Sequence, residues 1–583
     1  MKKLKRTFGN VLFLLKPWWK YGKSLVIWSQ FFTIIYPVRI IAEVTIAQGI
    51  IEAAQSGRGT AHVVLVAVAY ITVIVGLWIA REARIRVFES WIKVDITAAI
   101  EREIYEKAIR TDYMYVDSPD FFDNYKMATD EYVSRSQKMW DSVNTLAGGI
   151  VGLLSMVGVF LTTEPFVIIL VFVGLGIMAV FRFFIASNET EIWRINTPSR
   201  RRMNYVTRLL YMKSANADLR ATNAKDRIFE HYNASKDSII NVAKRFRWKQ
   251  FLYGCIYIIG GNLATYIVML YTALGFVSGR IESIGVFTTL VAATGNMSFQ
   301  FSQITDNVTS IFETTLYADK VRQFFGLHSE IEPSTGRTTP ADAPLSLELR
   351  DVSFSYPNSE FGLKNLNITV NAGEKIAIVG ENGAGKTTLS KLLLRLYDVN
   401  SGEILYNGVN IKDYDVRALR RQIGVAFQEP HLYTLTVREN MQVYHSASDE
   451  VLREVLQTVG LDADLDRDVT REFDDSGIML SGGQAQKLGL SRLLIGEFGL
   501  LLLDEPSSAL DPLAEYEMTK LMFNRSRTTT IMVAHRLSTI RDADCIYLIS
   551  NGAVAEQGTH DELIALNGKY AEMFSKQAEN YVR

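Results

Sequence analysis

A glycine-rich segment in the second half of the chain has the residue types needed to bind phosphate groups. Gly380–Thr387 reads G-E-N-G-A-G-K-T and fits the pattern G-x-x-x-x-G-K-[ST]. A buried-strand pattern precedes it, and helix-forming residues follow from Lys386 to Leu396. In this setting glycines let backbone N–H groups approach phosphates, the lysine adds positive charge, and the threonine hydroxyl can ligate Mg²⁺. The predicted nucleotide contacts are Gly380, Glu381, Asn382, Gly383, Ala384, Gly385, Lys386, Thr387 and Thr388.

Two adjacent carboxylates follow another apolar run further along the chain. Leu500–Leu503 has the composition of a buried strand and ends in Asp504 and Glu505. In phosphoryl transfer one carboxylate can hold Mg²⁺, and a second can orient or deprotonate the attacking water. Because a phosphate-binding loop is present in the same chain, we expect Asp504 to hold Mg²⁺ and Glu505 to act as the base.

Two further motifs complete an ordered set. Leu480–Gln484 reads L-S-G-G-Q, and Ala534–Arg536 reads A-H-R. With the phosphate loop and the paired acids, this order resembles the nucleotide-binding domain of ABC transporters. The resemblance places that α/β P-loop domain at 345–583, a linker rich in Pro, Ser and Thr at 328–344, and an exporter-type membrane domain at 1–327.

The resemblance implies an ATP sandwich, in which the phosphate loop of one domain faces the signature segment of another. The signature residues are Ser481, Gly482, Gly483 and Gln484. A helix expected to begin near Gly483 would point free backbone N–H groups at the γ-phosphate, because helix N-termini bind anions. The chain departs from the usual pattern at Thr470–Asp475 and at Ala485–Leu488, which puts contacts to the membrane domain in question, and not hydrolysis.

Four more functions are implied by the resemblance alone. Tyr356, after the first strand pattern, would stack on adenine. Gln428, after the strand pattern Ile423–Phe427, would sense Mg²⁺ as one of its ligands and link to the membrane domain. Asp511 would bridge the two nucleotide domains, and His535 would contact the γ-phosphate as a catalytic residue. ATP and Mg²⁺ are the expected cofactors.

The first half of the chain has the composition of a membrane protein. Hydrophobic residues make up 48% of the 583 residues. Apolar segments long enough to cross a bilayer, for which about 20 residues are needed, predict six transmembrane helices near 24–51, 61–80, 142–163, 165–181, 251–279 and 283–305. The long connections 81–141 and 182–250 are rich in Lys and Arg, which places them, both termini and the ATPase domain in the cytosol.

The two long connections are expected to be helical and to extend the spans into the cytosol. Each contains a predicted break. Ser118-Pro119-Asp120 has the hydroxyl, proline and acid typical of a helix start. The second break is predicted near 216–220. Short helices at these two places could dock on a soluble domain.

Polar residues inside the spans indicate where a substrate could bind. Arg39 and Glu43 lie four residues apart on one face of the first span. Charges in a bilayer are costly and usually face an interior or a cavity. A structural ion pair, a substrate contact and a position near the interface all stay open. The residues that could line the same cavity are Asn262, Asn296, Gln300 and Gln303.

Together these features predict a half-transporter in the cell membrane that exports a substrate by alternating access. We expect a peptide or a hydrophobic or amphiphilic small molecule. An importer of siderophore-like cargo, a lipid flippase and a non-transporting regulatory ATPase are the alternatives. A second half is needed as partner, and because every consensus residue is present, a homodimer is favoured over a heterodimer. The net charge of −1 gives no reason to expect nucleic acid, and two distant cysteines form no disulfide framework.

Overall fold

The computed structural model describes residues 2–281, 283–331, 344–357, 361–472, 475–506, 510–523, 525 and 527–582. The chain divides into two compact units. The first is Met1–Lys107 with Asp123–Gly326, and the second is Ala108–Phe122 with Leu327–Arg583. The short segment Ala108–Phe122 therefore belongs with the C-terminal unit. Residues 332–343, most of the expected linker, lie outside the described part of the chain.

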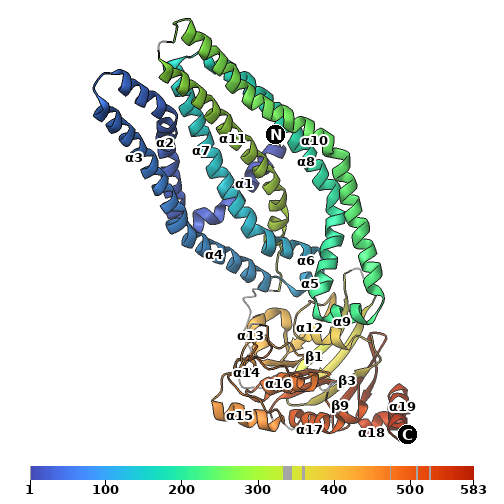
Figure 1. Ribbon diagram of the computed structural model, residues 1–583. Coiled ribbons are helices and arrows are strands. Elements are labelled where there is room, and N and C mark those ends of the chain that lie inside the picture. The colour runs from blue at the N-terminus through green and yellow to red at the C-terminus, as the bar shows by residue number, and fades with distance from the viewer. Residues whose placement is uncertain are drawn as a thin grey trace. The chain divides into compact units, whose positions relative to one another are not determined.

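The first unit is built from long helices (Figure 1). One π-helical stretch, Arg84–Glu89, joins the helices α3 (Thr60–Ala83) and α4 (Ser90–Ile109). Another, Met127–Glu131, precedes the helix α7 (Tyr132–Thr163). The helices are α1 (Lys2–Tyr21), α2 (Lys23–Gln55), α3 (Thr60–Ala83), α4 (Ser90–Ile109), α6 (Pro119–Lys126), α7 (Tyr132–Thr163), α8 (Val167–Tyr211), α9 (Lys213–Ala221), α10 (Ala224–Val277) and α11 (Ile284–Phe325).

Five of the described helical stretches are long and apolar enough to cross a membrane. They begin at Lys23, Thr60, Asn124, Val167 and Ala224. The sixth expected span is present as the helix α11, 42 residues long, but it is not among those five. Polar residues at its centre, including Asn296, Gln300 and Gln303, lower its mean hydropathy.

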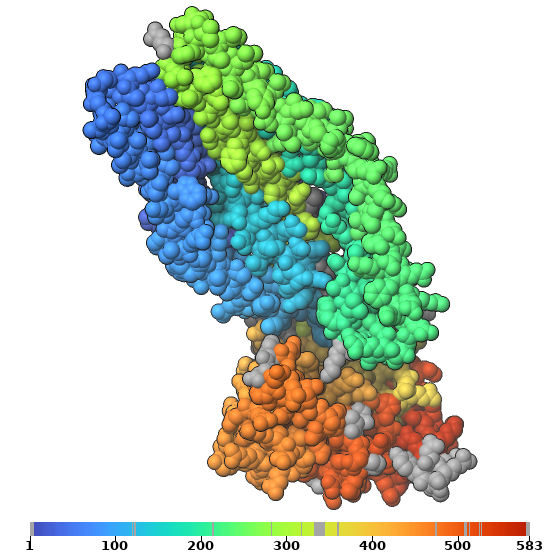
Figure 2. Space-filling view, in the orientation of Figure 1, coloured from blue at the N-terminus to red at the C-terminus, as the bar shows by residue number. Residues whose placement is uncertain are grey.

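Helices α7 and α11 form the centre of this unit. They pack along each other, with α2 beside both, and the α8–α10 pair runs along the other side (Figures 1 and 2). Ile40, Met156, Phe160 and Met297 are buried in the shared core. α8 and α10 approach closely because small residues face each other: a Cβ added at Gly174 would lie 2.6 Å from the Cβ of Ala264.

The two predicted breaks are present, with one adjustment. At the first, the chain forms α5 (Tyr113–Val116) and then α6, where the Ser118 hydroxyl accepts a hydrogen bond of 3.2 Å from the Phe121 N–H. At the second, residues 216–220 lie inside the short helix α9, not at a break. The chain leaves helical geometry on either side instead, at Met212 and at Thr222.

The second unit contains two sheets. A four-stranded antiparallel sheet has the order β2-β1-β4-β5, and a six-stranded sheet has the order β10-β9-β3-β8-β7-β6, parallel except for the β9–β10 pair. The strands are β1 (Leu347–Ser355), β2 (Gly362–Val370), β3 (Lys375–Gly380), β4 (Ser401–Tyr406), β5 (Val409–Asn410), β6 (Ile423–Ala426), β7 (Leu500–Asp504), β8 (Thr529–Val533), β9 (Cys545–Ser550) and β10 (Ala553–Gly558).

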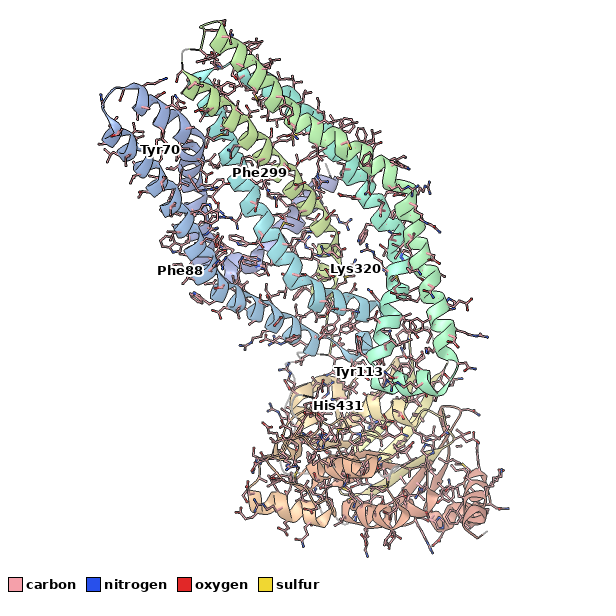
Figure 3. All side chains as sticks on the ribbon, viewed as in Figure 1. Tyr70, Phe88, Tyr113, Phe299, Lys320 and His431 are labelled. Atoms are coloured by element: carbon pink, nitrogen blue, oxygen red, sulfur yellow. The ribbon has the colours of Figure 1, made fainter. Side chains whose placement is uncertain are left out.

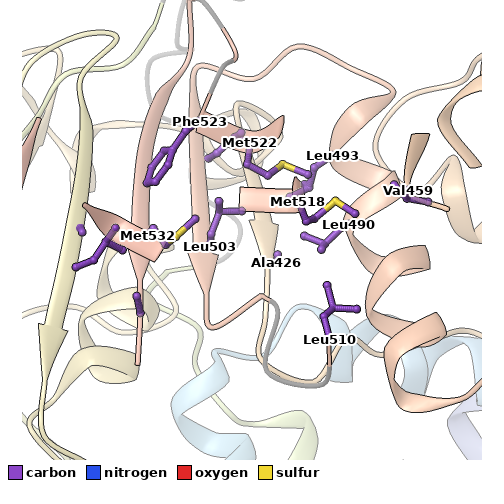
Figure 4. Close-up of a cluster of buried hydrophobic side chains, with 14 of the residues drawn as sticks. Ala426, Val459, Leu490, Leu493, Leu503, Leu510, Met518, Met522, Phe523 and Met532 are labelled. Carbon is purple, nitrogen blue, oxygen red and sulfur yellow. The ribbon is translucent and has the colours of Figure 1, made fainter. Parts of the chain in front are cut away.

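Helices cover the six-stranded sheet. They are α12 (Lys386–Leu393), α13 (Val416–Arg421), α14 (Val437–Met441), α15 (Asp449–Thr458), α16 (Gly482–Leu494), α17 (Pro512–Phe523), α18 (His560–Leu566) and α19 (Lys569–Val582). Every residue of β7 and β8 is buried, as expected of central parallel strands. In Figure 4, Leu503 of β7 lies between Met532 of β8 on one side and Leu490, Leu493 and Met518 of α16 and α17 on the other, all in one buried cluster.

Helix α12 is shorter than the sequence pattern suggests. We expected it to continue to Leu396, but its last residue is Leu393. Arg395 takes a φ of 50°, in the left-handed region that ends helices. The Arg395 guanidinium donates to the carbonyls of Ile411 and Lys412, both at 3.3 Å, so contacts with another part of the fold hold this turn.

Candidate functional site

Residues predicted to bind phosphate and Mg²⁺ lie at one edge of the six-stranded sheet. β3, β8, β7 and β6 are neighbours and run parallel, so their carboxyl ends lie at the same edge. Lys386, His535, Asp504 and Gln428 each follow or end one of these strands. Open parallel sheets bind ligands outside this edge. Residues separated by more than a hundred positions are therefore brought to one edge of the sheet.

The glycines of the phosphate loop are required by its backbone. Gly380, Gly383 and Gly385 have φ values of 155°, 79° and 107°. A Cβ would lie 2.2 Å from the Ile549 carbonyl oxygen at Gly380, and 2.4 Å from a Leu363 methyl at Gly385. Larger residues would be strained in this loop, whose turn leads directly into the first residue of α12.

The side chain of Lys386 is enclosed by this loop. Its Nζ donates to the carbonyl oxygens of Gly380 at 2.8 Å and Glu381 at 3.1 Å. Burial lowers the pKa of the Lys386 ammonium, and the nearby carboxylates of Glu505 and Asp504 act against that shift. The loop therefore holds a cation in a position where it can meet phosphate oxygens.

Asp504 is a buried acid whose surroundings suit a divalent cation. Burial, and then the charge of Glu505, raise the pKa of Asp504 to about 6. Its Oδ1 atom has no hydrogen-bond partner among the described residues. An unpartnered buried carboxylate oxygen is costly unless a ligand satisfies it, and Mg²⁺ prefers oxygen ligands. Thr387, at the start of α12, is exposed and can offer its hydroxyl.

Glu505 and His535, the two residues assigned to hydrolysis, are in contact. His535 Nε2 meets Glu505 Oε1, and the carboxylate is the more buried of the two side chains. Glu505 has a φ of 51°, an unusual value for a residue with a side chain. Its N–H donates to the Val533 carbonyl at 3.0 Å, which ties this strained turn to β8.

The C-terminal helix α19 contacts two loops of the site, the one that contains His535 and the phosphate loop. The sequence did not indicate these contacts. Gln577 donates to the His535 carbonyl at 2.7 Å and accepts from the Leu537 N–H at 2.9 Å. Lys569 forms an ion pair of 3.2 Å with Glu381 in the phosphate loop. These contacts join residues far apart in the sequence, so no local residue spacing indicates them.

Tyr356 lies beside the phosphate-loop helix. Its hydroxyl is 3.2 Å from the Thr388 hydroxyl, and its ring meets the ring of Tyr397 edge-on at 5.4 Å between centroids. The ring of Tyr356 is only partly buried. It is thus an aromatic surface next to the nucleotide loop, as base stacking requires.

The segment Ala108–Phe122 contacts the same aromatic group. Asp117 accepts a hydrogen bond from the Tyr397 hydroxyl and lies 3.4 Å from Lys391 Nζ. Tyr113 meets Tyr397 edge-on at 5.8 Å. The docking expected for the first break is therefore found within this unit, through an aromatic cluster next to Tyr356.

The signature segment begins α16, one residue earlier than expected. Ser481 is its N-cap: the Ser481 hydroxyl accepts from the Gln484 N–H, and the Gln484 side chain accepts from the Ser481 N–H at 2.9 Å. Gly482 is exposed. Among the described contacts, none joins Ser481–Gln484 to the phosphate loop of the same chain.

Gln428 and Asp511 lie on loops with separate partners. Gln428 is exposed after β6, and its carbonyl accepts from the Gln486 side chain at 3.2 Å. Asp511 accepts from the N–H groups of Leu513 and Ala514 at 3.1 and 3.0 Å, and these bonds help to lower its pKa. The residues just before it, 507–509, lie outside the described part of the chain.

Arg39 and Glu43 in the first span form an ion pair within α2, and Arg39 also lines a cavity, so a structural pair, a substrate contact and a position near the interface all stay open. Arg39 and Glu43 are 2.5 Å apart. Gln300 and Gln303 line a cavity with Arg39, as expected. Asn262 and Asn296 do not line that cavity; they donate to the carbonyls of Ile258 at 2.9 Å and Ala292 at 3.3 Å on their own helices.

Comparisons with known proteins show what these features are similar to. Residues 363–508 match the family described as ABC transporter. The chain is 29% identical, over all of its length and 95% of the relative, to the subtilin transport ATP-binding protein SpaT of Bacillus subtilis. It is 36% identical to the ATP-dependent lipid A-core flippase of Salmonella paratyphi A, over 43% of this chain and 44% of that protein.

A solved structure extends the likeness to nearly the whole fold. A bacterial Atm1-family ABC exporter with ATP bound aligns with a TM-score of 0.78, covering 95% of this chain and 98% of that one. The sequence identity is 22%, so this match concerns the fold. It supports the arrangement of a helical domain followed by an α/β ATPase domain.

Proposed function

Because this chain is an ABC half-transporter of the exporter type, an ATP hydrolase coupled to membrane transport, we propose that two copies assemble into one transporter. In the proposed homodimer each phosphate loop faces the signature segment of the other copy. A heterodimer with a related chain is the second candidate, since each site would then be shared in the same way.

The observation that carries this proposal is the separation of two half-sites within one chain. Lys386, Asp504, Glu505 and His535 gather at one sheet edge, whereas the described contacts of Ser481 stay within its own helix start. Each half-site has groups suited to phosphate, and neither is complete alone. A second copy supplies what each lacks.

In this proposal each residue has a defined task. Lys386 and the loop N–H groups hold the β- and γ-phosphates. Glu505 takes a proton from the attacking water, and His535, in contact with Glu505, binds the γ-phosphate. Asp504 and Thr387, joined by Gln428, would hold Mg²⁺, which supplies charge neutralisation at the phosphates. The exposed N-terminus of α16 from the partner would complete the anion site.

Closure around ATP is proposed to change the access of the helical unit. Two closed ATPase domains would expose a cavity to the outside, and hydrolysis would reset it. Asp117 and Tyr113 support this coupling, because they reach the aromatic cluster beside Tyr356. We place the protein in the cytoplasmic membrane with its termini and ATPase domain in the cytosol, on the basis of the Lys and Arg in the long connections.

Export of an amphiphilic molecule is the direction and cargo that we favour. The relatives named above are a subtilin transport protein and a lipid A-core flippase. A lipid, named in the second of these, is an amphiphile, and a lipid flippase is the second candidate. An importer with this architecture is the third.

The test is made with the purified chain in lipid vesicles of known orientation. Native mass spectrometry should give a dimer with two ATP molecules, and ATP added on the side of the ATPase domains should drive flux away from that side. A stable monomer without ATPase activity would contradict the homodimer. Flux toward the ATP side would favour the importer, and hydrolysis with no flux of any tested cargo would favour a regulatory ATPase.

A further inference from the structure

The helical unit contains a cavity of about 400 Å³, and the charged residues that line it are all positive. Arg39, Arg81 and Arg84 line it, together with aromatic rings from α2 and α11. Phe299, labelled on α11 in Figure 3, is one of these rings. No Asp or Glu is among the described residues that line the cavity.

Two of the three arginines have acidic partners just outside the cavity. Arg39 lies 2.5 Å from Glu43, and Arg84 lies 3.2 Å from Glu89. Arg81 forms no ion pair with any residue in the described ranges. The cavity therefore has an excess positive charge. Of the three, Arg39 lies within the predicted span 24–51, where a charge costs on the order of 2.5–3.5 kcal/mol on insertion scales and usually marks a ligand pathway. Arg81 and Arg84 lie just beyond the predicted span 61–80, at the end proposed to be cytosolic.

The paired arginines also have open hydrogen-bonding capacity. The Nε atom of Arg39 is buried and has no hydrogen-bond partner among the described residues. Its guanidinium lies 5.1 Å from the ring centroid of Tyr36, and that of Arg84 lies 5.3 Å from the ring of Phe32. Cation–π contacts of this kind fix the guanidinium planes. The donors are thus held in place before an anion arrives.

A second cavity, of about 290 Å³, adjoins the first, because Phe32 and Arg84 line both. Its other lining is largely aromatic and aliphatic, and includes Trp28, Phe88 and Trp91. Glu89 is the acidic residue of its described lining, and its charge is paired with Arg84 at 3.2 Å and Lys93 at 3.5 Å. Phe88 follows α3 at the position labelled in Figure 3. A cationic cavity thus opens beside an apolar one, within the helices α2, α3, α4, α7 and α11.

We propose that these two cavities bind an anionic single-chain amphiphile, with its head group at Arg81 and its tail against Trp28 and Trp91. This inference rests on the proposed transport function and names the class of its cargo. The single excess charge matches one anionic head group. The volume of the apolar cavity suits one hydrocarbon tail and not a folded peptide. Apolar burial of that tail supplies affinity, and Arg81 supplies selectivity for the anion.

The test uses the full chain in phosphatidylcholine nanodiscs with four dodecyl probes. These are dodecanoate and dodecyl phosphate, which are anionic, neutral 1-dodecanol and cationic dodecylammonium. Both anions are expected to raise the ATPase rate, and the other two are not. A response to dodecyl phosphate alone would assign the head group as a phosphate, and a response to dodecanoate alone would assign it as a carboxylate. Equal responses to all four probes would overturn the inference.

Matched variants locate the effect. Arg81→Gln should raise the dodecanoate concentration for half-maximal stimulation about tenfold or more, and Arg81→Lys should restore most of the response, because it keeps the charge. Arg86→Gln is the control: Arg86 is five residues away, exposed, and paired with Glu82 at 2.8 Å. An equal shift for both Gln variants would contradict the assignment, as would a response of Arg81→Gln identical to that of the parent chain.

A binding readout separates this inference from the proposed function. The brominated probe 11-bromoundecanoate should quench tryptophan fluorescence less in Trp28→Phe and Trp91→Phe than in the parent chain, and as much as in the parent chain in Trp248→Phe, a control on α10. The three tryptophans are similarly exposed, at 59%, 59% and 68%, so the control is matched for exposure. Equal quenching in all three variants would overturn the tail site. If the parent chain hydrolyses ATP normally and shows no preference for the anions, the inference fails alone. If it shows neither ATPase activity nor nucleotide binding, the proposed function fails first.

Discussion

His535 Nε2 touches Glu505 Oε1, although the two residues leave different strands of the central sheet. Register explains the contact: Asp504 of β7 pairs with Val533 of β8, so the residues that follow both strands emerge together. The Glu505 N–H then bonds to Val533, which fixes the carboxylate beside the imidazole. Glu505, the proposed base, and His535, the proposed γ-phosphate contact, are therefore held next to each other.

Replacing the proposed base should separate binding from hydrolysis. Glu505→Gln keeps the shape of the side chain and removes its ability to accept the proton from water. We expect ATP to bind with near-normal affinity, while the turnover rate falls by roughly 10²–10⁴-fold. Single-turnover hydrolysis and nucleotide binding are measured on the same sample. Turnover near the parent rate would remove Glu505 from this task.

Loss of the loop cation should weaken binding. Lys386→Ala removes the buried ammonium that now bonds to Gly380 and Glu381. A hydrogen bond to a charged group contributes about 1.5–3 kcal/mol, so ATP affinity should fall about 10- to 100-fold. Lys520→Ala, exposed on α17, is the control and should bind ATP like the parent. Equal affinities for all three proteins would contradict the role.

Asp504 should cost stability in the nucleotide-free protein. Burial and the Glu505 charge raise its pKa to about 6, above its ordinary value, so the folded state favours the protonated form. Between the ordinary pKa of this carboxyl group and about 6, the free energy of unfolding of the protein therefore falls as pH rises. At pH 7.5 the ionised side chain costs on the order of 3 kcal/mol.

Asp504→Asn should therefore raise the apparent unfolding temperature at pH 7.5 and raise it about half as much at pH 5, because part of the penalty is still present between the ordinary pKa and about 6, while Mg²⁺-dependent hydrolysis is lost. Intrinsic fluorescence at a fixed heating rate provides the measurement. Asp542→Asn, an exposed position after η4 (Leu537–Ile540), is the control. A lower unfolding temperature for Asp504→Asn at pH 7.5 would show that the carboxylate stabilises the fold.

Gln577 should affect the rate of ATP hydrolysis by holding the loop that contains His535. Its side chain donates to the His535 carbonyl and accepts from the Leu537 N–H. Losing a hydrogen bond costs about 1 kcal/mol, so Gln577→Ala should lower kcat about fivefold, with ATP affinity within twofold of the parent. Gln577→Glu keeps the acceptor and loses the donor, so it should lower kcat as well.

Lys576→Ala is the matched control, since Lys576 pairs with Glu572 on the same helix at 2.6 Å. Its kcat should equal that of the parent chain. If Gln577→Ala lowered ATP affinity and kcat together with thermal stability, α19 would support the fold and not the loop in particular.

Much of this site was predictable because its motifs are local. The phosphate loop, the acids after β7 and the start of α16 each consist of consecutive residues whose strand or helix context is visible in the sequence. Long-range partners were not predictable. Gln577 reaches a loop 42 positions away, and the contact of Asp117 with Tyr397 spans 280 positions. No periodicity encodes such pairs, because they depend on how the elements pack.

The membrane half shows the same limit. Apolar runs predicted where the long helices lie, α11 included, although α11 is not among the five described helical stretches that are apolar enough to cross a membrane. The side-chain partners of the charges were only partly predictable. The spacing of Arg39 and Glu43 indicated a pair on one helix, whereas the cavity that Arg39 shares with Arg81 and Arg84 follows from packing.

The central claim is that two chains share each ATP site, and a cross-link tests it most directly. In chains with Cys255→Ala and Cys545→Ala, one copy has Asn382→Cys and a differently sized copy has Ser481→Cys, both with Glu505→Gln. A disulfide needs Cα atoms within about 7 Å. We predict that ATP and Mg²⁺ produce a cross-linked pair of unequal chains, absent with ADP. Absence of this product with ATP, together with an intramolecular disulfide in a chain that has both cysteines, would contradict the shared site.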